Sequence, residues 1–221
     1  PPIYLIDNLK TPNSPGDEVS ADIVPGAVNR ILFSSSSENT EGKDISPVTG
    51  QKFADIFIAE YDSARSKWSL PKPFGDSLKI NTEAHESGIA ADRQGKLIVF
   101  ARAVYTSGQK MTSQLYFSKK ENGRWTTPEQ ILFTTDGASY IDPSVSCDGK
   151  WLLFASDRAG GKGKTDIWKS EIKEGQFSGP VNMGEQINTP GRETGPYMKK
   201  NGHLYFSSDY HPGVGGLDIF R

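Results

Sequence analysis

The sequence is poor in the features on which several large classes of protein depend. Cys147 is the single cysteine among 221 residues, so no disulfide can form within the chain. No apolar run approaches the length of a membrane-spanning helix. Lysine and arginine are scattered and the net charge is −2, whereas a nucleic-acid groove or an anionic membrane surface needs a concentrated basic patch. We therefore expect no nucleic-acid partner and no direct membrane insertion.

Signals for helices are scarce as well. The chain has 23 glycines and 14 prolines, and no stretch free of both carries a 3.6-residue apolar stripe of helical length. A single all-β domain of 221 residues is ordinary, so we predict one all-β domain over residues 1–221. The chain begins at Pro1 without a methionine, which indicates a processed or excised piece.

What the sequence does contain is a repeat. Four apolar runs end in phenylalanine, and the last two of these phenylalanines, Phe154 and Phe206, lie 52 residues apart. A second phrase of Asp, Ile and an aromatic residue recurs downstream, and the units close on phrases such as Ile187-Asn188-Thr189. Ordered anchors recurring together indicate a repeat architecture. The predicted units are 12–82, 83–135, 136–189 and 190–221.

We interpret each unit as a blade of about four strands, and the whole as a β-propeller with four visible blades. Runs such as Trp151–Phe154 are apolar throughout, as expected for strands covered on both faces. Residues 2–11 resemble the last strand of a unit, and the fourth unit lacks one, so the N-terminal strand is expected to close the ring. A β-sandwich is the alternative fold.

Several phrases resemble the WD40-like repeats of TolB-type propellers, among them 154–161, 206–210, 182–189 and 215–220. More narrowly, they are similar to the propellers of Bacteroidetes envelope lipoproteins, in which the propeller often lies beside an OmpA-like peptidoglycan-binding domain. Some of these lipoproteins belong to the type IX secretion machinery. The resemblance implies a periplasmic protein associated with the outer membrane. Propellers of this family commonly have more than four blades, so the resemblance also leaves open that the four units are part of a larger ring. It implies peptidoglycan binding only through a companion domain that residues 1–221 do not include. Unit two departs from the pattern at Ala101-Arg102 and Gln114.

Acidic residues recur where each unit enters its innermost strand, and Glu18, Glu86, Asp142 and Glu193 are the candidates. These connections gather at one end of a propeller channel, so the carboxylates are candidate binding residues there. They either cap turns or form an acid and base pair for glycoside hydrolysis, which needs two carboxyl groups facing one another.

The aspartates that open the second recurring phrase, Asp55, Asp166 and Asp218, are predicted to accept hydrogen bonds from turn amides rather than to hold a metal. The loop Gly160–Thr165 ends like a phosphate-binding loop, but Arg158 stands where the first glycine is required. We accordingly expect no metal and no other cofactor.

The loops that join second to third strands vary most in length, from Tyr210–Gly216 to the long insert Glu38–Ala54. Variation confined to one face of a fixed scaffold is typical of a contact surface. We therefore predict a non-catalytic protein-interaction scaffold that meets other cell-envelope proteins through this face, with Arg158 and Tyr210 as further candidate binding residues. The alternative is a propeller that binds or hydrolyses carbohydrate with the carboxylates at the channel mouth.

Overall fold

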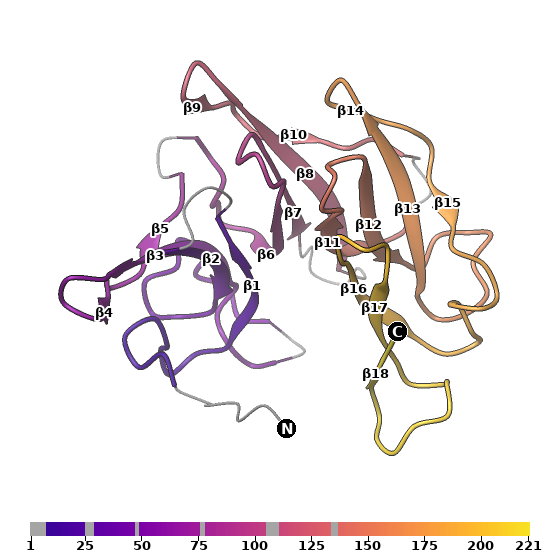
Figure 1. Ribbon diagram of the computed structural model, residues 1–221. Helices are drawn as coiled ribbons and strands as arrows, with labels where there is room; N and C mark the ends of the chain where they lie inside the picture. The colour runs from indigo at the N-terminus through magenta and orange to yellow at the C-terminus, as the bar shows by residue number, and fades with distance from the viewer. Residues whose placement is uncertain (1–7, 25–28, 47–48, 76–77, 105–110, 134–136) are drawn as a thin grey trace.

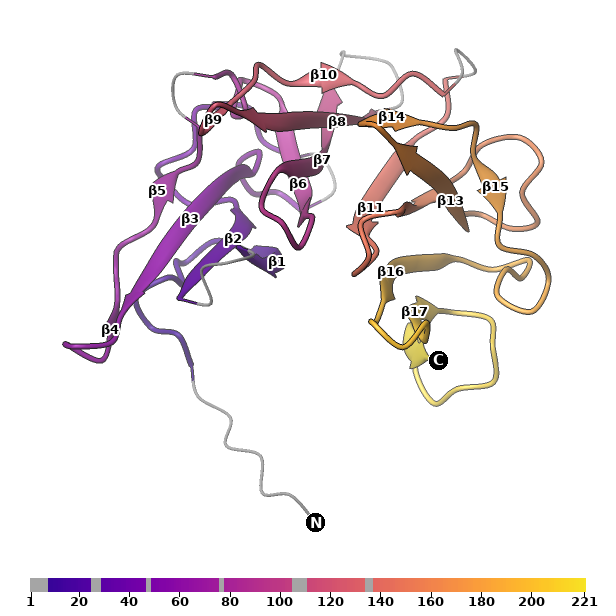
Figure 2. The ribbon, with the colours of Figure 1, turned by 45° about the horizontal axis from the view of Figure 1, so that its top comes forward.

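Four antiparallel sheets follow one another along the chain and stand around a common centre (Figures 1 and 2). The structure is a computed structural model that describes residues 8–24, 29–46, 49–75, 78–104, 111–133 and 137–221. Every element in these ranges is a strand, and the four sheets form the blades of a β-propeller. The predicted fold class is therefore confirmed, and the β-sandwich alternative was wrong.

Each of the first three sheets has three principal strands and two short outer ones, whereas the fourth has three strands. The strands are β1 (Glu18–Ile23), β2 (Arg30–Ser35), β3 (Asp55–Asp62), β4 (Lys67–Trp68) and β5 (Lys72–Pro73); β6 (His85–Ala91), β7 (Leu97–Val104), β8 (Thr112–Glu121), β9 (Arg124–Trp125) and β10 (Glu129–Gln130); β11 (Tyr140–Val145), β12 (Trp151–Ser156), β13 (Asp166–Lys173), β14 (Gln176–Phe177) and β15 (Val181–Asn182); and β16 (Glu193–Met198), β17 (Leu204–Ser208) and β18 (Asp218–Phe220).

The first strand of each sheet is the innermost, and these strands contact one another in chain order, β1 with β6, β6 with β11, and β11 with β16. The apolar second strands lie between neighbouring sheets. In β12, for example, every residue from Leu152 to Ser156 is buried, because one face meets the second sheet and the other meets the fourth. Burial on both faces of these strands thus explains the continuous apolar runs of the sequence.

The phrase Ile187-Asn188-Thr189 carries the chain from the third sheet to the fourth. The side-chain oxygen of Asn188 accepts a hydrogen bond from the N–H of Ile167 at 2.7 Å, and its amide donates to the Ile167 carbonyl at 2.9 Å. Asn81 makes the same two bonds to Ile56, at 2.8 and 2.9 Å. A buried asparagine therefore takes the place of a strand partner for the backbone of β3 and β13.

The prediction of an N-terminal strand over residues 2–11 places Thr11 where the third unit has Thr189, and the structure differs. Of the predicted strand 2–11, residues 2–7 lie outside the described residues, and residues 8–11 form no strand. The position equivalent to Thr189 is held by Ser14, three residues beyond the predicted Thr11, because Ser14 bonds Glu18 as Thr189 bonds Glu193. Whether segment 2–7 pairs with the fourth sheet stays a prediction.

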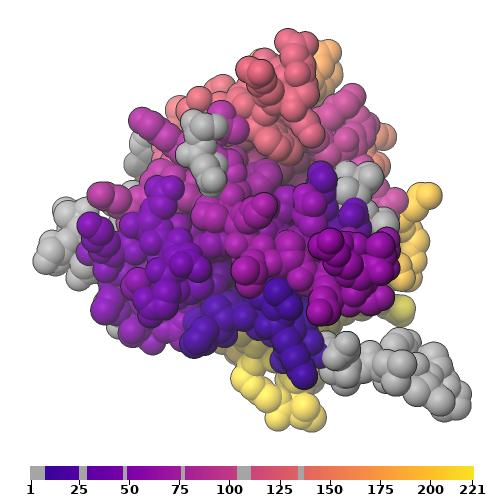
Figure 3. All heavy atoms as spheres, turned by 90° about the vertical axis from the view of Figure 1, so that its left-hand side faces the viewer, coloured from indigo at the N-terminus to yellow at the C-terminus, as the bar shows by residue number. Residues whose placement is uncertain are grey.

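The first and fourth sheets are the two ends of the arc (Figure 2). A view from the side of the first sheet shows its indigo and violet residues covering most of that side of the molecule (Figure 3). Three apolar clusters lie between consecutive sheets, whereas the cluster of Phe33, Phe57 and Ala59 is confined to the first sheet.

Candidate functional site

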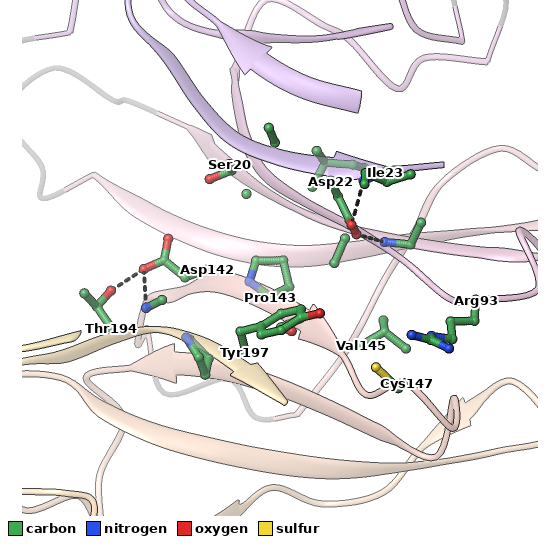
Figure 4. A pocket seen from close by; sticks show the side chains of 18 residues that line it. Ser20, Asp22, Ile23, Arg93, Asp142, Pro143, Val145, Cys147, Thr194 and Tyr197 are labelled. Atoms are coloured by element: carbon green, nitrogen blue, oxygen red, sulfur yellow. Dashed lines mark hydrogen bonds between the residues drawn. The ribbon is translucent and has the colours of Figure 1, made fainter. Parts of the chain in front are cut away.

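The four innermost strands surround one central cavity of about 730 Å³. Each strand contributes the same stretch to it, the residues around a β-bulge in its middle. Figure 4 shows these side chains converging from the four sheets. The polar and aromatic side chains of the lining are those of Ser20, Asp22, Arg93, Asp142, Ser144, Cys147, Thr194 and Tyr197.

The bulges share one backbone conformation. Ser20, Gly88, Asp142 and Gly195 occupy equivalent positions with φ of 55°, 61°, 51° and 57°. Two of the four are glycine, for which the left-handed region carries little cost, and the other two are short polar residues. The bulge turns the inner strand once per blade and brings backbone and short side chains to the cavity.

At the bulges, neighbouring blades are joined either by an aspartate that accepts hydrogen bonds from the next blade or by direct packing. Asp142 of β11 accepts hydrogen bonds from the Thr194 hydroxyl and from the Gly195 N–H of β16, and Asp22 of β1 accepts one from the Ala91 N–H of β6 at 2.9 Å (Figure 4). Burial raises the pKa of Asp22 above its ordinary value, although the hydrogen bonds from the N–H groups of Ala91 and Ile23 oppose the shift. Between the second and third sheets, where no such carboxylate stands, Gly88 packs directly against Pro143.

Glu18, Glu86 and Glu193 do not line the cavity. Each stands two residues before a bulge, and each is bonded by the hydroxyl group four residues earlier, that of Ser14, Thr82 or Thr189, at 2.5 to 2.6 Å. Glu86 and Glu193 are fully buried. Of the four predicted acids, therefore, Asp142 alone reaches the cavity, and the other three act as local acceptors.

Each of these glutamates has a second partner on the neighbouring strand. Ser35 bonds Glu18 and Ser208 bonds Glu193, but unit two has Arg102 at this position, and its guanidinium bonds Glu86 at 2.7 Å. Arg102 also donates to the carbonyls of Lys79 and Ile80. The departure of unit two from the repeat pattern thus replaces a hydroxyl by a buried ion pair.

Arg158 and Tyr210 lie in the loops after β12 and β17. The Arg158 guanidinium is 4.7 Å from the centre of the Trp168 ring, an arrangement typical of a cation–π contact. Tyr210 is exposed, and its N–H bonds the Ser208 hydroxyl. The structure places both residues at the loop end of their blades, apart from the cavity lining.

The loop aspartates accept hydrogen bonds from turn amides, as predicted. Asp166 accepts from the N–H groups of Lys162 and Gly163 at 2.6 and 2.9 Å, and Asp218 accepts from those of Val214 and Gly215. In the first sheet, Asp55 accepts from the Glu41 N–H at 2.6 Å, and its other oxygen is buried without a hydrogen-bond partner in the described structure. Burial raises the pKa of Asp55 to about 7, with a smaller contribution from the Glu86 carboxylate.

The long insert is anchored to the second sheet beside this aspartate. The His85 Nδ1 atom accepts a hydrogen bond from the Ala54 N–H at 3.0 Å, and its ring meets that of Phe53 edge to face. Burial lowers the pKa of His85, which keeps the ring neutral and able to accept this bond. The side chains from Lys43 to Ile45, by contrast, are exposed, although the backbone of Asp44 and Ile45 pairs with Phe53 and Lys52. The insert thus combines a fixed base with exposed side chains.

Within the described ranges, no group of three or more His, Cys, Asp or Glu residues is arranged to hold a metal ion. The part of the chain that the structure describes also contains no helix long and apolar enough to cross a membrane. The central cavity was not predicted from the sequence. Its signal was the glycine or proline near the middle of three inner strands, as in Gly195-Pro196, which marks the bulge.

The fold is similar to that of TolB proteins. TolB from Acinetobacter baumannii superposes with a TM-score of 0.52 and 12% identity over 92% of this chain and 40% of that one. TolB from Agrobacterium tumefaciens gives 0.50 and 18% over 81% of this chain and 50% of that one. The chain thus spans about half or less of their length. Trypanosoma rangeli sialidase scores 0.47 with 10% identity, over 88% of this chain and 34% of that one. No family model and no curated protein matches the sequence.

Proposed function

We propose that this chain is a non-catalytic protein-interaction module of the bacterial cell envelope, which meets a partner protein through the loops between second and third strands. The observation that carries the proposal is the construction of the insert 38–54. Its base is held by Asp55 and His85, and the apolar side chain of Ile45, which is paired with Lys52, is exposed to solvent. A rigid base spares a binding loop much of the ordering entropy that association costs.

The cellular setting belongs to the same proposal. The module serves in the periplasm as part of an outer-membrane-associated lipoprotein, linked to peptidoglycan through another domain and engaged in type IX secretion. The TolB-like fold supports a propeller built for contact with other proteins. The repeat phrases of the third and fourth units, which resemble those of Bacteroidetes envelope lipoproteins, support the finer assignment.

The alternative of glycoside hydrolysis needs two carboxyl groups that face a substrate across a cavity. Two of the predicted acids, Glu86 and Glu193, are buried, bonded within their own blades and absent from the cavity lining. Asp142 and Asp22 do line the cavity, but each carboxylate is already bonded to the neighbouring blade. The geometry therefore favours the interaction module.

Two exposed apolar residues of the first sheet supply a matched test. Ile45 lies in the insert, and Leu70 lies on the outer rim between β4 and β5. In the native protein, we expect Ile45→Glu to abolish chemical crosslinking to an envelope protein and Leu70→Glu to leave it unchanged, with melting temperatures of both variants within about 2 °C of the wild type. Equal crosslinking by the two variants would show that the insert is not the contact.

A further inference from the structure

Two buried hydrogen-bond donors lie beside one another in the third sheet without an acceptor. Trp168 of β13 is 4% exposed, and its indole Nε1–H has no acceptor in the described structure. The Nε–H of Arg158 is also buried and has no acceptor there. The Arg158 guanidinium lies 4.7 Å from the centre of the Trp168 ring, so both donors belong to one contact. Because buried N–H groups are almost always paired, this contact indicates an acceptor that a ligand supplies.

The charge of Arg158 is unpaired as well. Among the described residues, none forms a salt bridge with its guanidinium. The terminal nitrogens of Arg158 are not among the buried unpaired atoms, so the side chain runs from a buried Nε to an end that solvent reaches. An indole covers the flat face of this guanidinium, which leaves its nitrogen-bearing edge for hydrogen bonds. That edge matches the two oxygens of a carboxylate.

The loop that carries Arg158 is basic throughout. Residues 158–165 contain three cations, Arg158, Lys162 and Lys164, and no acidic residue. In the part of the chain that the structure describes, Lys162 pairs with the exposed Glu185, and no salt bridge involves Lys164. Such an excess of positive charge on one loop attracts an acidic partner and disfavours a basic one.

The backbone of this loop is held in place before any ligand arrives. Asp166 accepts hydrogen bonds from the N–H groups of Lys162 and Gly163. The N–H of Lys164 donates to the Gly191 carbonyl at 2.7 Å, and Gly163 packs so closely on the same carbonyl that a side chain would not fit. The cations therefore project from an ordered backbone, which spares a ligand the cost of ordering the loop.

The neighbouring loop of the fourth sheet adds apolar side chains to this surface. Gly191 lies between the two loops, because a Cβ atom there would lie 2.5 Å from the Tyr210 side chain. Tyr210, Val214 and Leu217 are all exposed. Apolar and aromatic residues beside a cation suit a protein segment that has an acidic residue among apolar ones. A sugar acid, by contrast, would bring hydroxyl groups to these apolar side chains.

We propose that Arg158 and Trp168 form a carboxylate-binding site, which takes an aspartate or glutamate side chain of the partner protein. The edge of the guanidinium and the indole N–H supply the hydrogen-bond donors, and Lys162 and Lys164 add attraction at longer range. The inference rests on the proposed function, because it names the chemistry of the partner at the same face. It does not involve the insert that carries Ile45, so the two proposals can fail separately.

The test follows the indole N–H signals of the native full-length protein in two-dimensional 1H–15N spectra. The probe is the peptide acetyl-Gly-Glu-Gly-Glu-Gly-amide, and the control peptide has glutamine in place of glutamate. In low salt we expect the acidic peptide to shift the Trp168 signal with a Kd of about 1–10 mM and the control peptide to leave it in place. Trp151 is the internal control, because Lys169 lies 4.8 Å from its ring in the same sheet, and its signal should not move.

Two substitutions separate the site from the general charge of the loop. Arg158→Gln should weaken binding of the acidic peptide at least about tenfold, because the charged donors are lost. Lys164→Gln removes the same charge from the same loop and should weaken binding at most about threefold. Arg158→Lys keeps the charge without the planar edge and should behave like Arg158→Gln.

Three results would overturn the proposal. The first is a Trp168 signal that the acidic peptide does not move in the wild type, a measurement that needs no variant and so holds even if a change at Arg158 prevents folding. The second is equal weakening by Arg158→Gln and Lys164→Gln. The third is a shift of the Trp168 signal by N-acetylmuramic acid at concentrations about tenfold lower than those of the peptide, which would assign the site to a glycan. Crosslinking that Ile45→Glu abolishes and Arg158→Gln leaves intact would uphold the proposed function and refute this site.

Discussion

Asn188 bonds both the N–H and the C=O of Ile167 through one side chain, and both residues are buried. We expect Asn188→Ala to leave the buried Ile167 N–H unpaired, whereas the Ile167 C=O keeps the hydrogen bond from the Met183 N–H, and to lower the free energy of unfolding by about 1–3 kcal/mol. Urea denaturation monitored by tryptophan fluorescence measures the change. Asn201→Ala, in an exposed turn, is the control and should change the free energy of unfolding by less than about 0.5 kcal/mol. Equal effects would mean that the buried bonds contribute nothing.

Alanine substitutions at Gly88 and Gly195 test how tightly the second and third sheets pack at the bulge. Both have a left-handed backbone, but a Cβ atom at Gly88 would lie 2.9 Å from the Pro143 side chain, whereas one at Gly195 would meet no atom within 4 Å. Gly195→Ala should cost only the backbone strain, about 1–2 kcal/mol. Gly88→Ala adds overpacking and should cost about 2–4 kcal/mol. Thermal unfolding of the two variants gives the comparison, and equal losses would show that the sheets move apart freely.

Asp55 should make the protein less stable as the pH rises. Its pKa is about 7 in the folded chain and 3.8 by reference, so the folded state holds the proton more tightly. The resulting stabilisation is complete below pH 3.8 and is lost as the pH rises through about 7. We expect Asp55→Asn, which stays neutral, to gain about 1–2 kcal/mol relative to the wild type between pH 5 and pH 8. Urea denaturation at the two pH values measures it, and a constant difference would contradict the burial of the charge.

His85 should act in the opposite sense. Its folded pKa lies below the reference value of 6.5, so the unfolded state binds the proton more tightly. The stability that the neutral ring provides is present above pH 6.5 and is lost as the pH falls through the folded pKa. His85→Asn keeps an acceptor for the Ala54 N–H but does not titrate. Between pH 7.5 and pH 5, the variant should lose about 1 kcal/mol less than the wild type in the same assay. Parallel losses in the two proteins would rule out His85 as the titrating group.

The sheets were predictable because their signal is local and repeated. Residues Leu152–Phe154 form an apolar run that only two-sided burial explains, and the phrase beginning at Asp166 marks the next strand of the hairpin. The fold class followed from counting such anchors. The register of the N-terminal end could not be predicted in this way. Thr11 and Ser14 are both followed by proline, and only the hydrogen bond to Glu18 distinguishes them.

The candidate site was only partly predictable. The glutamates recur in sequence at the expected places, but the residue of each blade that reaches the cavity is set by the bulge two positions later. Asp142 was predicted as an acidic residue at the entry to an inner strand, and it reaches the cavity because it lies on such a bulge; Asp22 and Tyr197 follow a bulge and were not predicted. The pairing of Arg102 with Glu86 could not be predicted either, because the first and fourth blades have serine where unit two has arginine.

The linker 187–189 belongs to two blades at once. Its asparagine completes the third sheet through Ile167, and its threonine supports the fourth through Glu193. Blade boundaries in this molecule are therefore shared rather than sharp. A shortened protein that stops where β15 ends would strip the third sheet of a buried partner, so a stable fragment has to retain the linker as a C-terminal cap.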